Sequence, residues 1–138
     1  GGDTGTVNVP VSKELRSGKS IMIVEDERII SRMLSKIVEE EGYDLVDCVS
    51  SGREAVSYAI EKKPDLVIMD ILLEDDIDGI EAARIISADH DCRIIFLTGN
   101  SDPGTINSAW DVKPYRILTK PIQRYQLIEV IQSAFEAV

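Results

Sequence analysis

Residues 65–70 read DLVIMD, a short apolar run that follows Pro64 and ends in a carboxylate. Its length and its Val and Ile content are typical of a strand that is buried on both faces. Four further runs have the same character and are also expected to be strands. They are SIMIVE at 20–25, LVDCVS at 45–50, RIIFLT at 93–98 and YRILT at 115–119.

The intervals between these runs carry the periodicity of helices. Apolar stripes at helical spacing lie at 29–38, 55–60, 80–86 and 127–134. Gly42 is placed to end the first helix, Ser51 to cap the second and Pro64 to stop it, while Pro121 is expected to open a long final helix. The interval 103–111 is short and weakly patterned. Strands that alternate with helices predict an α/β fold with a parallel sheet and helices on both faces.

The composition is that of a globular chain with an acidic surface. The 138 residues are 43% hydrophobic, and 15 basic against 25 acidic side chains give a net charge of −10. This charge argues against nucleic acid and membranes as direct partners. Cys48 and Cys92 lack the spacing of a metal or disulfide site, so we expect reduced core thiols and a cytoplasmic location. Residues 1–18 have no signal-peptide pattern and are expected to be a flexible leader, or a linker or tag remnant, before one domain at 19–138.

Polar residues close the apolar runs. In a parallel sheet the carboxyl ends of the strands form the ligand crevice. Glu25 and Asp26 follow the first run, Asp70 and Thr98 end the third and fourth, and Lys120 follows the fifth. Each alone is consistent with a solvated loop residue or a helix cap. Together they place three carboxylates, one hydroxyl and one amine at one edge of the sheet.

Three neighbouring carboxylates are tolerated in ionised form when a cation sits among them. An all-oxygen set of ligands suits Mg²⁺, which also leaves positions open for phosphate oxygens. A carboxylate beside such an ion can attack phosphorus and form an aspartyl phosphate. Lys120 would then neutralise charge on the transferred phosphoryl group, and the Thr98 hydroxyl would hydrogen-bond one of its oxygens.

With these motifs the sequence resembles the receiver domain of two-component response regulators, of the chemotaxis-regulator type. The matching motifs are IMIVEDE, LVIMD, FLTG and LTKP, and the resemblance covers about residues 19 to 137. Asp70 follows Asp26 by 44 residues (70 − 26), Thr98 follows Asp70 by 28 (98 − 70), and Lys120 follows Thr98 by 22 (120 − 98). The resemblance implies a doubly wound, flavodoxin-like sheet of order 2-1-3-4-5, an order for which the chemotaxis regulator is itself a standard example.

The resemblance also implies roles for the site residues. Asp70 corresponds to the phosphoacceptor, and Glu25 and Asp26 to the Mg²⁺-binding pair. The backbone carbonyl of Leu72 corresponds to a further metal ligand, Thr98 to the switch residue and Lys120 to the phosphate-contacting lysine. The Lys120–Pro121 bond is expected to be cis, with a trans proline at the first helical position as the alternative. Catalysis would be limited to self-phosphorylation and self-dephosphorylation.

Two stretches depart from the family pattern. Ile117 stands where relatives carry Tyr or Phe in the switch. Strand alternation predicts that Tyr115 shares its face, either as a substitute for that aromatic residue or simply as an edge residue. The stretch ILLEDDIDGIE at 71–81 lacks the proline common after the acceptor. Its acidic residues lack calcium-loop spacing and are expected to form a solvated loop, with Asp78 as a helix cap. Leu72 and Asn100 are expected to tune the lifetime of the phosphorylated state, and Gly99 to leave room for the donor imidazole.

The resemblance implies a sensor histidine kinase or phosphotransfer protein as phosphoryl donor. Output would pass through the face formed by 103–111, 115–119 and the final helix, to a downstream protein or domain or to a second copy of the chain. Trp110 lies on this face, as a contact residue or as a buried structural one. SGKS at 17–20 lacks the first glycine and the preceding strand of a phosphate-binding loop. A phosphorylation-independent binding module and a haloacid-dehalogenase-like phosphatase are alternatives, although Leu72 stands where such a phosphatase has its second Asp.

Overall fold

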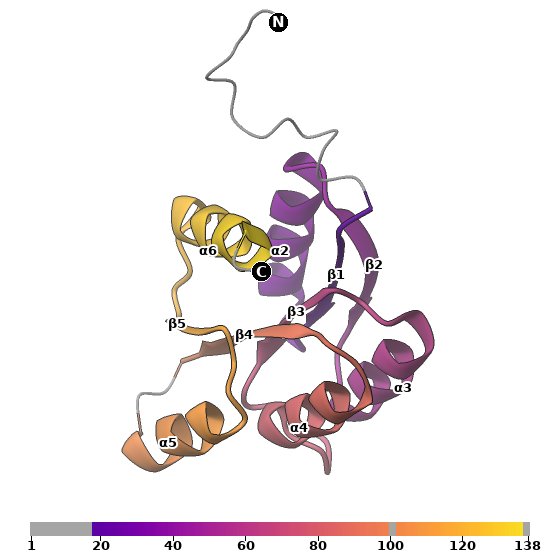
Figure 1. Cartoon of the computed structure of the whole chain (residues 1–138). Helices are drawn as coiled ribbons and strands as arrows, with labels where there is room; N and C mark the ends of the chain where they lie inside the picture. The colour runs from indigo at the N-terminus through magenta and orange to yellow at the C-terminus, as the bar shows by residue number, and fades with distance from the viewer. Residues whose placement is uncertain (1–17, 100–101, 137–138) are drawn as a thin grey trace, which may run out of the picture.

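The computed structural model describes residues 18–99 and 102–136, so most of the expected leader at 1–18 and also Asn100 lie outside the described residues. Strands and helices alternate along the chain (Figure 1). They are β1 (Ser20–Val24), α2 (Arg28–Glu40), β2 (Asp44–Val49), α3 (Gly52–Lys62), β3 (Leu66–Asp70), α4 (Gly79–Asp89), β4 (Arg93–Thr98), α5 (Pro103–Asp111), β5 (Arg116–Thr119) and α6 (Arg124–Glu136). Among these helices none is both long and apolar enough to cross a membrane.

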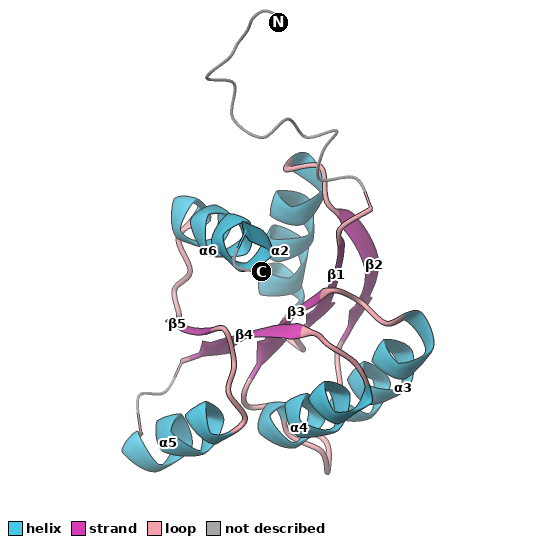
Figure 2. Cartoon of the chain, in the orientation of Figure 1, coloured by secondary structure: helices cyan, strands magenta, loops and turns pink. Residues whose placement is uncertain are grey.

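The five strands form one parallel sheet of order β2-β1-β3-β4-β5, which confirms the predicted fold. Helices α2 and α6 cover one face, and α3, α4 and α5 cover the other (Figure 2). Because all strands run in the same direction, their carboxyl ends share one edge. The strand order reverses direction between β1 and β3, which is where a ligand crevice is expected in sheets of this kind.

The central strands are buried on both faces. Along β1, Ile21 and Ile23 pack into the core beneath α2 and α6, while Met22 and Val24 pack into the core beneath α3, α4 and α5. All five residues of β3 are buried. This two-sided burial explains why these strands read as continuous apolar runs rather than alternating ones.

The helix ends follow the sequence signals, with one correction. The Ser51 hydroxyl accepts the Glu54 N–H at 3.1 Å, and Gly42 follows α2 with a left-handed φ of 88°. The Lys120–Pro121 bond is cis, as expected. However, α6 begins at Arg124 and not at Pro121. Ile122 packs into the core between them, so the chain turns inward before the helix begins.

The prediction that both cysteines are core thiols is wrong for Cys48. It lies exposed on β2, which is an edge strand, where its Sγ contacts the Ser31 and Ser35 hydroxyls of α2. Cys92 is partly buried, and burial together with the negative charge of Asp65 raises the pKa of its thiol to about 12. Both cysteines are free thiols.

Candidate functional site

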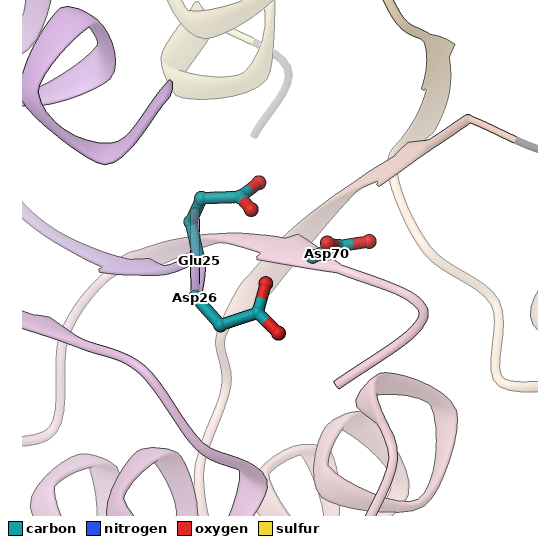
Figure 3. A group of neighbouring side chains, drawn as sticks. All are labelled: Glu25, Asp26 and Asp70. Atoms are coloured by element: carbon teal, nitrogen blue, oxygen red, sulfur yellow. The ribbon is translucent and has the colours of Figure 1, made fainter. Parts of the chain in front are cut away.

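The ends of β1 and β3 bring three carboxylates together, as the sequence predicts. Glu25 and Asp26 directly follow β1, and Asp70 ends the neighbouring parallel strand β3. One oxygen from each carboxylate lies within 4.8 Å of the others (Figure 3). Glu25 and Asp70 are 2% and 6% exposed. Two of the three acids are therefore largely removed from water and face one another.

Lys120 is the cation of this cluster. Its Nζ lies 3.1 Å from Glu25 Oε1, 3.2 Å from Asp70 Oδ2 and 3.4 Å from Glu27 Oε1. Burial alone lowers the pKa of Lys120, but the carboxylates of Glu25 and Asp70 outweigh burial and raise it. The lysine is thus held in its charged form. With Asp26 included, one ammonium group faces four carboxylates.

Glu25 shows that the cluster lacks positive charge. Burial, reinforced by the negative charge of Asp70, raises the pKa of Glu25 above its ordinary value. Its Oε2 accepts the Glu27 N–H at 3.1 Å, whereas the buried Oε1 has one charged neighbour, the Lys120 ammonium at 3.1 Å, which it shares with Asp70 and Glu27. One shared ammonium group does not balance several neighbouring carboxylates, and buried carboxylates are costly unless further positive charge binds them. The donor set, all oxygen and rich in charge, therefore fits Mg²⁺.

The loop after β3 closes around the Asp70 carboxylate. Asp70 Oδ1 accepts the Leu72 N–H at 3.1 Å, which keeps residue 72 beside the cluster. A Cβ on Gly79 would lie 2.2 Å from the Asp70 backbone oxygen, so the start of α4 approaches Asp70 too closely for any side chain. Glycine is needed here for space, a reason that the sequence alone does not reveal.

Thr98 lies at the end of β4 and is buried beside the cluster. Its carbonyl accepts the Lys120 N–H at 2.8 Å, which aligns the chain after β5 with β4. The side chain does not line the pocket over the carboxylates, whereas the next residue, Gly99, does. A Cβ on Gly99 would meet nothing within 4 Å, so the space beside the pocket is open.

A pocket of about 360 Å³ opens over these groups. Sequence reasoning missed two of its acids, Glu27 and Glu74. Glu27 directly follows the acidic pair, so its position was a usable signal. No sequence signal points to Glu74, because its position depends on the path of the loop after β3. The lining residues are Asp26, Glu27, Asp70, Leu72, Glu74, Gly99 and Lys120.

The prediction that Tyr115 and Ile117 lie on the same face of the sheet is wrong. Tyr115 packs on the α2 and α6 side of the sheet and hydrogen-bonds Ser133 of α6, whereas Ile117 packs on the opposite side with α3, α4 and α5. Strand alternation does not apply because β5 begins at Arg116 and a left-handed Lys113, with φ of 56°, precedes Tyr115. Tyr115 therefore does not replace an aromatic residue at position 117.

Comparison with known proteins identifies the family. The response regulator receiver domain matches residues 21–132. The chain belongs to this family. Receiver domains are signalling modules of two-component systems, and their acidic pocket binds Mg²⁺.

Curated relatives differ in how much of them the chain covers. The transcriptional regulatory protein PdtaR of Mycobacterium tuberculosis is 37% identical over 116 residues, which are 84% of this chain and 56% of PdtaR. YvrH of Bacillus subtilis is 32% identical, over 83% of this chain and 48% of YvrH. The chain thus spans about half the length of these two relatives. The chemotaxis protein CheY of Thermotoga maritima is 30% identical, over 83% of this chain and 95% of CheY.

A solved structure has the same architecture. The signal receiver domain of a modulated diguanylate cyclase from Desulfovibrio desulfuricans G20 superposes with a TM-score of 0.81 at 34% identity. The match covers 86% of this chain and 94% of that domain. The fold of this receiver domain is therefore that of its relatives.

Proposed function

We propose that this receiver domain takes a phosphoryl group from a phosphohistidine onto Asp70, and that phosphorylation switches a protein-interaction surface. The donor would be a sensor histidine kinase or a phosphotransfer protein. The observation that carries the proposal is the placement of the Asp70 carboxylate in an open pocket, 3.2 Å from Lys120 Nζ and within reach of two further carboxylates. We also propose a cytoplasmic location, consistent with two free thiols.

Residues of this chain would divide the chemistry among them. An Asp70 carboxylate oxygen forms the new bond to phosphorus while the bond from phosphorus to the histidine nitrogen breaks, and the imidazole leaves. Lys120 would neutralise charge on the phosphoryl oxygens, and the Thr98 hydroxyl would donate a hydrogen bond to one of them. Water later hydrolyses the acyl phosphate and returns Asp70 to its free form.

Mg²⁺ would be held by Glu25, Asp26, Asp70 and the backbone carbonyl of Leu72. Bound there, the ion supplies the positive charge that the four carboxylates lack and that the incoming phosphoryl group requires. The buried Glu25 Oε1 supports this assignment, because the ammonium group beside it is shared with two other carboxylates.

Two exposed surfaces support protein partners. Ile29 is 85% exposed near the start of α2, two residues beyond Glu27 at the pocket, and we propose it as a contact for a docked phosphoryl donor. Trp110 is 47% exposed on α5, so it is a contact candidate rather than a buried structural residue. We propose the face of α5, β5 and α6 as the output surface, used by a downstream protein or domain or by a second copy of the chain.

Intact-mass measurement after incubation with acetyl phosphate tests the proposal. We expect a Mg²⁺-dependent gain of one phosphoryl group in the wild type and none in Asp70→Asn. Asp91→Asn is the matched control, because Asp91 is an exposed aspartate away from the pocket. Phosphorylation of Asp70→Asn would overturn the assignment of the acceptor. No gain in any protein would favour a phosphorylation-independent binding module.

A further inference from the structure

The loop after the acceptor strand caps a helix that is distant in sequence. The Asp75 carboxylate accepts the N–H groups of Gly52 and Arg53, the first two residues of α3, both at 3.0 Å. The Ser51 hydroxyl accepts the third N–H of this helix, from Glu54. The first turn of a helix has N–H groups without partners in the helix, and a carboxylate is favoured there. Asp75 therefore completes the N-terminus of α3 from another part of the chain.

Two further contacts hold the same loop against α3. The Arg53 guanidinium binds the Asp76 carboxylate through two nitrogens, with an Nε to Oδ1 distance of 3.1 Å. Gly52 lies directly against the loop, because a Cβ there would be 1.9 Å from the Ile77 backbone oxygen. We call the contacts of Asp75, Asp76 and Ile77 with α3 the loop clamp.

The clamped loop also forms part of the phosphorylation pocket. The residues that follow Asp70 alternate in their environment. Ile71 and Leu73 are buried in the core, whereas Leu72 and Glu74 line the pocket. Leu72 is three residues before Asp75. The core fixes the first half of the loop and the clamp fixes the second half, so the backbone at residue 72 is placed from both sides.

We propose that Asp75 and Arg53 are positioning residues, which hold the loop so that the Leu72 backbone carbonyl stays at the metal site. The inference rests on the proposed function, since it concerns the same Mg²⁺. The N-terminus of α3 should then respond to Mg²⁺ binding, because coupling between two sites is reciprocal. If the clamp favours Mg²⁺ binding, Mg²⁺ binding must stabilise the clamp.

Titration calorimetry with Mg²⁺ alone tests the first direction. Groups that orient metal ligands typically contribute about 10-fold to metal affinity, so we expect Asp75→Ala to raise the dissociation constant by about that factor. Asp75→Asn retains one acceptor oxygen and should give an intermediate value. Arg53→Ala removes only an exposed ion pair, with side chains 67% and 62% exposed, so this variant should fold and show a smaller increase.

Ser51→Ala is the matched control, because it removes a cap of the same helix without touching the loop. A merely structural clamp would act through the stability of α3, and then Ser51→Ala and Asp75→Ala would lower the melting temperature and the Mg²⁺ affinity in parallel. We expect both to lower the melting temperature and Asp75→Ala alone to weaken Mg²⁺ binding. Parallel losses, or unchanged affinity in Asp75→Ala and Arg53→Ala, would overturn the inference.

Hydrogen exchange tests the reverse direction. We expect Mg²⁺ to slow exchange of the Gly52 and Arg53 amides in the wild type but not in Asp75→Ala. Equal exchange with and without Mg²⁺ in a wild type that binds the ion would contradict the clamp. If the wild type binds Mg²⁺ and shows the coupling but is not phosphorylated, the proposed function fails while the positioning role of Asp75 stands.

Discussion

The two ends of the parallel strands, the amino edge and the carboxyl edge, combine acidic and basic side chains in opposite proportions. At the amino edge, Lys63 Nζ binds Asp89 Oδ2 at 2.8 Å, and His90 lies between the same carboxylate and the Pro64 carbonyl, 3.0 Å from each. One carboxylate there meets two basic side chains. At the carboxyl edge, one ammonium group, that of Lys120, meets three carboxylates.

The pKa shifts follow this difference. The hydrogen bond from Lys63, supported by His90, lowers the pKa of Asp89, whereas burial and the charge of Asp70 raise the pKa of Glu25. Folding therefore favours the charged form of Asp89 and disfavours that of Glu25. A balanced cluster stabilises the fold, whereas an unbalanced one is typical of a ligand site, here the proposed site for a cation and a phosphoryl group.

The lysine at the carboxyl edge should give the largest effect. Lys120→Ala removes the cation that contacts Asp70, and loss of such a charge typically slows transfer by about 100-fold or more. We expect the rate of phosphorylation by acetyl phosphate to fall by that factor at saturating Mg²⁺, with Mg²⁺ binding retained. Lys63→Ala, at the balanced edge, is the control and should keep the wild-type rate. Equal losses in both variants would mean that the two edges do not differ in function.

The variant Glu25→Gln should raise the stability of the fold and weaken Mg²⁺ binding. In Glu25→Gln the buried charge is lost, so we expect the free energy of unfolding without Mg²⁺ to rise by about 1 kcal/mol. The same change removes a proposed metal ligand, and we expect the Mg²⁺ dissociation constant to rise by about 10-fold or more. Denaturant unfolding and calorimetry measure the two quantities. A variant that is less stable and binds Mg²⁺ normally would mark Glu25 as structural.

The pH dependence of stability should have opposite signs at the two edges. Folding raises the pKa of Glu25 above 4.5, so its destabilising effect is absent below that pH and grows as pH rises toward the raised pKa. Folding lowers the pKa of Asp89 below 3.8, so its stabilising effect is present above that pH and disappears as pH falls through the lowered pKa. Unfolding of wild type, Glu25→Gln and Asp89→Asn in EDTA across this range measures both. Matching pH profiles for the two variants would contradict the comparison.

The smallest effect is expected from Asp89 at neutral pH. Asp89→Asn weakens a partly exposed pair, and we expect it to lower the free energy of unfolding only slightly. Mg²⁺ affinity and the rate of phosphorylation should stay at wild-type values. A change in either would show that the amino edge contributes to the site.

The sequence was sufficient to predict the sheet and the central acids for one physical reason. Central parallel strands are buried on both faces, so they appear as apolar runs, and the residue that closes each run must lie at one edge. Glu25, Asp26 and Asp70 were predicted in this way. Their long separation in sequence did not matter, because strand direction alone places them together.

Contacts that depend on the path of a loop were not predicted. The acidic loop after β3 was expected to be solvated, yet Asp75 binds the backbone of α3. Tyr115 was assigned to the wrong face, because its orientation is set by the residues before β5 and not by strand alternation. Local periodicity predicts neither the Asp75 contact nor the orientation of Tyr115, since both depend on where irregular backbone meets another element.

The contact between Glu25 and Lys120 joins residues that are 95 positions apart (120 − 25). A ribosome making this chain delivers Glu25, Asp26 and Asp70 before the lysine has been synthesised, and domains fold as the chain emerges. Until β5 is added, the nascent pocket is a group of acids without its ammonium counterion. The last strand therefore finishes the sheet and brings the Lys120 ammonium group to the acids in one event, so the charge arrangement needed for the proposed phosphoryl transfer forms only when folding is nearly complete.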